Sequence, residues 1–194
     1  MRELQAAQVA AAFILRAGRP VGILKLTKLM YLAEREAVQR FVYPIVCDDI
    51  YAMQRGMALS RTFDLMKQKV GTRTNGEWAR YIEARPHQGI GVRRGVTEDS
   101  LDGLSADDID VIDSVWRTYG GKSNDELIHE VHHGLEEWTA HWHDENRRSS
   151  AVPVSYESLF QLLCDMPEDQ ASEMAAEVAY FQSLADLGEE REIA

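Results

Sequence analysis

Long apolar runs, clustered cysteines and an excess of basic residues are all missing from this 194-residue sequence. No apolar run approaches the roughly 20 residues of a bilayer-spanning helix, and the early acid, Glu3, is not typical of a signal peptide. The two cysteines, Cys47 and Cys164, lie far apart in apolar surroundings, which favours buried free thiols over a disulfide framework or a zinc ribbon. We therefore expect a cytoplasmic protein without a membrane segment.

Acidic residues outnumber basic ones. The sequence has 32 Asp and Glu against 21 Lys and Arg, so the formal net charge is −11. This charge argues against a protein that coats nucleic acid and suits a partner with a basic surface, because opposite fields speed association. The motifs G-x-G-x-x-G, P-loop and G-x-S-x-G are also absent from the sequence. These nucleotide-binding and hydrolase classes are therefore not predicted.

Most of the chain has the apolar spacing and the capping signals of helices. A helix is predicted over residues 4–16, and a second carries apolar residues from Leu26 to Phe41 at spacings of three and four. Capping boxes begin helices at Ser105 and Ser123. Further helices are predicted near 58–69, 155–163 and from Pro167 onward. We expect the second and third helices to join in one core that contains Leu29, Met30, Tyr31 and Phe63.

Two segments are typical of strands. Residues 50–54 form a short extended segment that Gly56 interrupts, and residues 78–84 alternate large apolar with polar side chains. A turn signal at 86–89 then allows 90–93 to return as a second strand. The predicted fold class is mainly α: a compact helical domain with a small antiparallel β-ribbon or sheet inserted.

Residues 129–133, H-E-V-H-H, match the zinc-hydrolase motif H-E-x-x-H on a predicted helix. His129 and His133 would share one helix face and could bind zinc, with Glu130 activating a water. The alternative is a polar face whose histidines pair with nearby acids. A zinc site needs a third ligand. Four candidates are present, but none stands at the spacing of a recognised zinc motif: Glu137, His141, His143 and Glu157. We interpret the match as coincidental and expect neither a metal nor a cofactor.

The sequence resembles the Panacea domain, also called the SocA-like antitoxin domain, in several ordered blocks. Residues 25–34, K-L-T-K-L-M-Y-L-A-E, are similar to the family's opening helix, and 51–65 are similar to its strand-to-helix block. Trp78 and the segment 133–138, H-G-L-E-E-W, match later positions. The family's His-Gly-Pro is Arg-Gly-Met here, and its late Pro is Glu136. The motif residues expected to be structural are Lys28, Tyr31, Gly56, Ser60, Trp78, His133 and Trp138.

This resemblance implies a domain over residues 1–150 with a helical extension, 151–194, packed on it. It also implies an antitoxin that neutralises a cognate protein toxin, encoded by a neighbouring gene, by direct contact and without a cofactor. A proteolytic adaptor or phage-encoded regulator built on the same domain, with a protease as a further partner, stays open, as does a zinc hydrolase. Homo-oligomers also stay open. Membrane and nucleic acid are not expected partners.

The toxin contact is predicted near the turn at 53–61 and on the exposed part of the 78–94 ribbon. Gly56 permits an unusual backbone conformation there, and methionine beside arginine is a common contact composition. The competing interpretation places the two methionines of this turn in the core. If the turn fails, the acidic helices at 107–113 and 168–177 are the next candidates. The predicted contact residues are Tyr51, Met53, Arg55, Met57 and Arg61.

Overall fold

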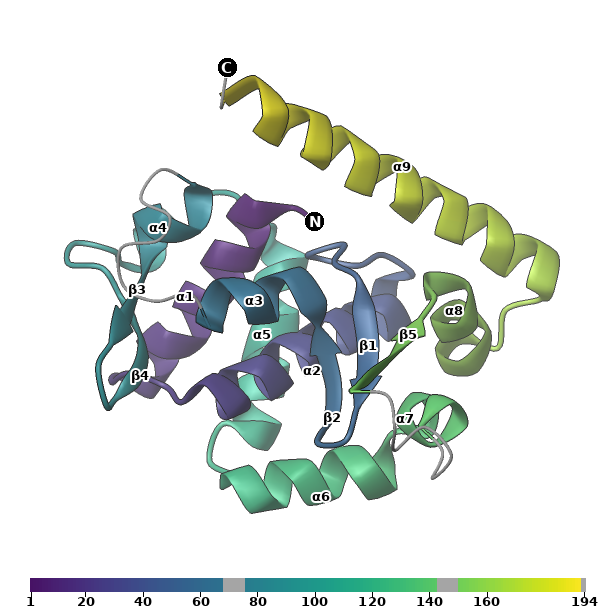
Figure 1. Ribbon diagram of the computed structural model, residues 1–194, viewed down its shortest axis with the longest axis horizontal. Coiled ribbons are helices and arrows are strands. Elements are labelled where there is room, and N and C mark those ends of the chain that lie inside the picture. Colours follow the sequence, from purple (N-terminus) through teal and green to yellow (C-terminus); the bar gives the residue numbers. More distant parts are fainter. Residues whose placement is uncertain (68–75, 143–149, 193–194) are drawn as a thin grey trace.

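A computed structural model describes residues 1–67, 76–142 and 150–192 of the protein. Within these ranges the fold is mainly helical with small antiparallel sheets, which confirms the predicted fold class. Figure 1 shows the two-stranded ribbon and the three-stranded sheet on opposite sides of the molecule. In chain order the elements are α1 Glu3–Ala17, α2 Ile23–Phe41, β1 Ile50–Met53, β2 Gly56–Leu59, α3 Ser60–Lys67, α4 Glu77–Tyr81, β3 Ile82–Arg85, β4 Gly89–Val92, a 3₁₀ turn Glu98–Ser100, α5 Ala106–Tyr119, α6 Asn124–Gly134, α7 Glu136–His141, β5 Ala151–Val154, α8 Tyr156–Cys164 and α9 Glu168–Glu192.

Helices α1 and α2 lie between the ribbon and the sheet and form the centre of the core (Figure 1). Every residue of α1 from position 6 to position 14 is buried, so this alanine-rich helix is covered on all sides. On α2, Leu29, Met30 and Tyr31 are at most 1% exposed, as predicted. Within the described part of the chain, no helix is both long and apolar enough to cross a bilayer.

Phe63 does not join this core, so its predicted place was wrong. Helix α3 begins at Ser60 and buries Thr62, Leu65 and Met66, which share one face at helical spacing. Phe63 falls beside that face and is only half-buried. Its ring lies under the Lys67 ammonium, whose Nζ is 4.0 Å from the ring centroid.

The three-stranded sheet has the order β2-β1-β5 and is antiparallel throughout. The expected strand at 50–54 is confirmed as β1, with Ile50 opposite both Leu59 and Val154. Strands β2 and β5 were not predicted, and α3 begins two residues later than expected. All four residues of β2 are buried, so it lacks the alternation that marks a half-buried strand. Strand β5 carries Pro153 opposite Tyr51.

The ribbon is formed by β3 and β4, joined by the predicted turn. The strand expected at 78–84 was wrong in its first half, because residues Glu77–Tyr81 form helix α4 and only Ile82–Arg85 are extended. Val21 pairs with Ile90 and attaches the ribbon to the start of α2. Gly89 has a φ of +109°, and a Cβ there would collide with the Val21 carbonyl. This close approach requires glycine.

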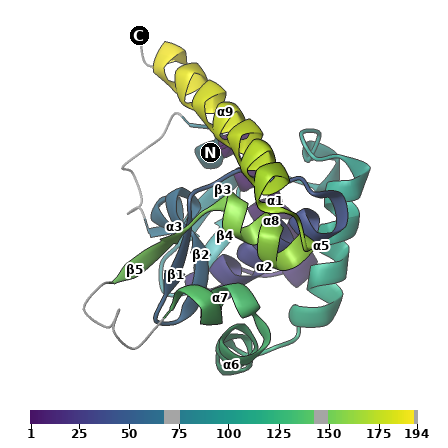
Figure 2. The same ribbon diagram turned by 90° about the vertical axis from the view of Figure 1, so that its right-hand side faces the viewer.

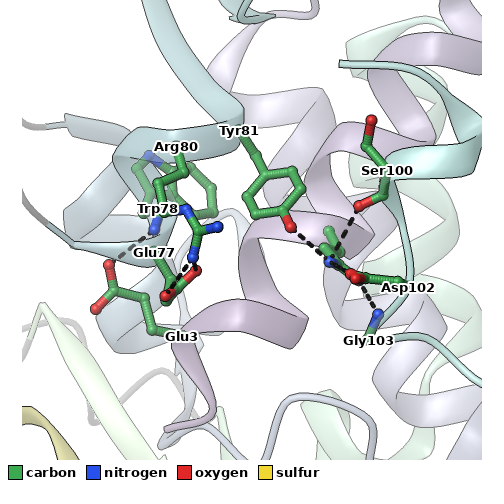
Figure 3. A network of polar contacts seen from close by, with 9 residues as sticks. Glu3, Glu77, Trp78, Arg80, Tyr81, Ser100, Asp102 and Gly103 are labelled. Atoms are coloured by element: carbon green, nitrogen blue, oxygen red, sulfur yellow. Dashed lines mark hydrogen bonds and ion pairs between the residues drawn. The ribbon is translucent and has the colours of Figure 1, made fainter. Parts of the chain in front are cut away.

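A buried glutamine on α1 holds the end of α4 and the segment before α5 together. Gln8 is fully buried, and its Nε2 donates to the Tyr81 hydroxyl and to Asp102 Oδ1, both at 2.9 Å. The Gly103 N–H donates back to Gln8 Oε1 at 2.8 Å. Figure 3 shows Tyr81, Asp102 and Gly103 meeting at this point, with Trp78 N–H donating to Glu3 on the other side of α4. The contacts satisfy a polar group that would otherwise be costly to bury.

The helix ends follow the sequence signals. Ser105 and Ser123 each form the predicted capping box, and Ser155 accepts a hydrogen bond from Ser158 N–H at the start of α8.

Helix α8 packs on α2, and α9 packs on α8. Figures 1 and 2 show the C-terminal half of α9 extending past the other helices. Because β5 pairs with β1, residues 151–154 belong to the central sheet. The domain boundary at residue 150 stays a prediction.

The connection between α2 and β1 is held by a buried carboxylate. Glu34 is 1% exposed and accepts hydrogen bonds from the backbone N–H groups of Ile45, Val46 and Cys47 at 2.8–2.9 Å. The Tyr156 hydroxyl donates to the same carboxylate at 2.7 Å. Burial raises the pKa of Glu34, although these donors oppose the shift. One α2 side chain therefore fixes both the connection and the start of α8.

Candidate functional site

The β1–β2 hairpin presents the predicted contact turn, and its geometry requires Gly56. Met53 pairs with Gly56, so Gln54 and Arg55 form the exposed turn between the strands. Gly56 has a φ of +97°. A Cβ at this position would collide with Cγ1 of Val131 on α6 and lie 3.3 Å from Lys28 Nζ. The glycine thus allows the turn to pack directly against α6 and α2.

A buried lysine supports the hairpin from below. Lys28 is 3% exposed, and its Nζ donates to the Met57 carbonyl oxygen at 2.8 Å. Burial disfavours the charged form and lowers the pKa of Lys28 to about 7. The family-motif lysine is therefore a structural residue that fastens β2 to α2.

A tryptophan on α7 supports the hairpin from the side. Trp138 Nε1 donates to the Met53 carbonyl oxygen at 2.9 Å. Its ring stacks on His132, with centroids 4.1 Å apart and planes within 11°. Burial, and secondly the neighbouring Lys28 charge, lower the pKa of His132. The hairpin is thus held by both α2 and α7 on either side of its turn.

Helix α7 is in turn fixed to α2 by a buried acid. Glu137 is fully buried, and its Oε1 accepts hydrogen bonds from the Tyr31 hydroxyl and from Arg35 Nε, both at 2.8 Å. Burial, followed by the charge of Glu137, raises the pKa of Tyr31 well above its ordinary value. The motif tyrosine therefore positions the helix that carries Trp138.

A second carboxylate anchors the other end of the sheet. Asp48 is fully buried and accepts hydrogen bonds from the N–H and the hydroxyl of Thr62, at 2.8 and 2.7 Å. Ser60, the motif serine, is the first residue of α3, and its N–H donates to the Asp49 carbonyl oxygen. Arg61 follows it and lies 4.0 Å from the Asp49 carboxylate. These contacts fix the start of α3 beside β1.

The structure separates Met57 from the other predicted contact residues. Arg55 is exposed at the turn, and Tyr51 and Met53 are half-buried on one face of β1. Met57 pairs with Ala52, whose side chain points to the opposite face, and both are fully buried. Met57 therefore lies in the core, as the competing interpretation placed it, and its burial argues against the predicted partner contact, which stays untested.

A cleft of about 490 Å³ lies beside this site, between the sheet, α8 and α9. Several of its polar lining residues form hydrogen bonds within the fold. Asp48 bonds Thr62, the Tyr156 hydroxyl donates to Glu34, and His141 bridges the Glu137 carbonyl oxygen and Ser158 Oγ. The arrangement suits a structural junction better than acid–base chemistry.

The H-E-x-x-H match lies on an exposed face of α6. His129 and His133 are exposed, with ring centroids 4.4 Å apart. Glu130 forms an ion pair with Lys122, with 2.7 Å between Oε1 and Nζ. Of the suggested third ligands, Glu137 is bound to α2, and His143 lies outside the described residues. The described residues contain no group of three His, Cys, Asp or Glu side chains that could hold a metal ion.

Several residues that build the site were not identified from the sequence. Asp48 and Glu137 bind other elements from buried positions, although Glu137 was expected only as a histidine partner or zinc ligand. Asp48 follows Cys47 and Glu137 precedes Trp138, and both neighbours were named from the sequence. A single sequence, however, does not distinguish a buried acid from an exposed one. Glu34 had a usable signal, because it lies three residues after Tyr31 on the apolar face of α2.

The fold and the site define a mainly helical scaffold that presents a firmly supported hairpin. The family model for the SocA-like antitoxins, the Panacea domain, matches residues 26–139. The chain therefore belongs to the SocA-like antitoxin family, which confirms the resemblance seen in the sequence. The match includes both strands of the hairpin, all of α6, α2 from Leu26 onward and α7 as far as Thr139, and these three helices support the hairpin; α1, β5, α8 and α9 lie outside it. No similar protein was found among the curated proteins or among the solved structures.

Proposed function

We propose that this protein is an antitoxin that binds a cognate protein toxin directly and neutralises it through the tip of the β1–β2 hairpin. Membership of the SocA-like antitoxin family carries this proposal. It requires a protein–protein contact and no catalytic step. The contact would take place in the cytoplasm.

The construction of the hairpin supports its use as a contact. Arg55 is exposed at the turn, while the carbonyl oxygens of Met53 and Met57 accept hydrogen bonds from Trp138 and Lys28. A loop that is already held in place loses little conformational freedom on binding. Arginine beside partly exposed aromatic and sulfur-containing side chains is a frequent composition of interface centres. Tyr51, Met53 and Arg55 are therefore the proposed contact residues, with Arg61 at the periphery.

Co-expression with the growth-inhibiting product of a neighbouring gene tests this function. We expect the chain to restore growth and to co-purify with that product. Arg55→Glu should abolish protection with unchanged stability, because the side chain is exposed. Arg117→Glu, the same charge reversal on the exposed face of α5, is the matched control and should still protect.

The outcomes separate the alternatives. Protection by a stable Arg55→Glu variant would refute the hairpin contact and move the site to the acidic helices. Failure of the chain itself to protect would refute the antitoxin function. A fall in toxin level, with no stable complex, would replace direct neutralisation by delivery to a protease.

A further inference from the structure

A group of large apolar side chains is exposed where α2 and α9 meet. Tyr43 and Phe181 are in edge-to-face contact, with ring centroids 6.2 Å apart, and Tyr180 continues the group at 6.0 Å from Phe181. The exposed fraction reaches 61% at Tyr180 and is at least 38% for each member. We call this group the aromatic patch; it consists of Tyr43, Tyr180, Phe181 and Leu184.

Contacts other than the Tyr43–Phe181 pair also hold α9 in place. Ala171 and Val178 are buried against the body, and Gln182 Nε2 donates to the Cys47 carbonyl oxygen at 3.1 Å. Tyr180 and Leu184 stand four residues apart on a different side of the helix. Exposed apolar groups of this kind are uncommon without a partner.

The α9 side of the patch is acidic. Glu173 and Glu177 precede Tyr180 and Leu184 at spacings of three and four, so they lie on the same face of α9. The sequence of α9 contains eight carboxylates and one arginine. On the other side of the patch, Arg2 Nη1 donates to the Tyr43 hydroxyl at 3.4 Å, and the Arg40 guanidinium is paired with Glu36 and Asp110. On the α9 side a partner would therefore meet apolar rings beside negative charge.

We propose that the aromatic patch is a docking surface for a basic segment of the partner protein, whose apolar side chains cover the rings. A second copy of this chain fits poorly, because it would bring one acidic α9 against another. The inference rests on the proposed function in one respect: it assumes that the partner is a protein. It adds a contact at the opposite end of β1 from the hairpin turn, built on a helix outside the matched family range.

Calorimetric titration of the full chain tests the docking surface. The probe is a synthetic amphipathic peptide with leucine on one face and lysine on the other, and its partner probe replaces every lysine with glutamate. We expect the lysine peptide to bind and the glutamate peptide not to bind. The double variant Tyr180→Ala, Leu184→Ala should weaken binding by at least about tenfold. Its folding should be unaffected, because both side chains are exposed.

A matched pair of charge variants separates a specific surface from general attraction. Glu173→Gln with Glu177→Gln should weaken binding severalfold, whereas Asp107→Asn with Asp125→Asn removes the same charge from other helices and should not. Equal losses in both pairs, no effect of the Tyr180 and Leu184 changes, or self-association through the patch in sedimentation would each overturn the proposal. The toxin is not used, so this result and the co-expression result can fail independently.

Discussion

Replacing Lys28 with methionine tests whether the amine beneath the hairpin is neutral when the protein is folded. Burial lowers the pKa of Lys28 from 10.5 to about 7. Between these values the unfolded chain binds a proton that the folded chain does not, so the free energy of unfolding rises with pH. The slope approaches about 1.4 kcal/mol per pH unit, which gives about 2 kcal/mol between pH 7 and pH 9. Well below pH 7 both states are protonated and the slope vanishes.

Urea unfolding of the wild type and Lys28→Met at a series of pH values measures this effect. The difference in unfolding free energy between the two proteins cancels the titration of all other groups. We expect that difference to shift in favour of the wild type by about 2 kcal/mol from pH 7 to pH 9. Lys67→Met, which removes a half-exposed lysine on α3, is the control and should give a constant difference.

A constant difference for Lys28→Met would refute the reasoning. It would mean that the ammonium stays charged in the folded protein and that water reaches Nζ beneath the hairpin. The hairpin would then be less firmly supported than the 2.8 Å bond to Met57 indicates.

Three further predictions concern the core and the histidines. Gly56→Ala should lower the free energy of unfolding by about 2–4 kcal/mol through backbone strain and the collision with Val131. The double variant with Val131→Ala should lose less unfolding free energy than the sum of the two single variants. Additive losses in this double-mutant cycle would contradict the collision. Leu29→Ala should cost about 2–5 kcal/mol by urea unfolding, and a loss under about half a kcal/mol would place this residue outside the core. Metal analysis of protein purified without added metal should find less than one zinc per chain; stoichiometric zinc that disappears in His133→Ala would restore the hydrolase interpretation.

The helices were predictable because each combines a sustained apolar period with a local end signal. In α2 the stripe that starts at Leu26 continues for four turns, and at α5 and α6 a serine and an acid three residues later mark the beginning. The short elements were harder. Strand β2 is buried on both faces, and Trp78 to Tyr81 is too short for a helical period to appear.

The sequence indicated a turn at Gly56, but not the contacts that support it, and the turn's role as a contact site stays a prediction. Gly56 and the family motif indicate the turn. The hydrogen bonds from Trp138 to Met53 and from Tyr31 to Glu137, however, join residues that are 85 and 106 positions apart in the sequence. Such pairings depend on how the helices pack, which one sequence does not reveal. Met57 was misplaced for the related reason that strand register decides which face a side chain occupies.

Pro153 makes one edge of the three-stranded sheet unfavourable for intermolecular β-pairing. Strand β5 is an outer strand of only four residues, and its proline has no backbone N–H to offer an incoming chain. The other outer strand, β2, has all four residues buried. In the described part of the sheet, neither outer strand is a template on which a second chain could add a strand. A protein that binds at this sheet is therefore expected to recognise side chains, and aggregation by joining this sheet edge to edge is disfavoured at the same time.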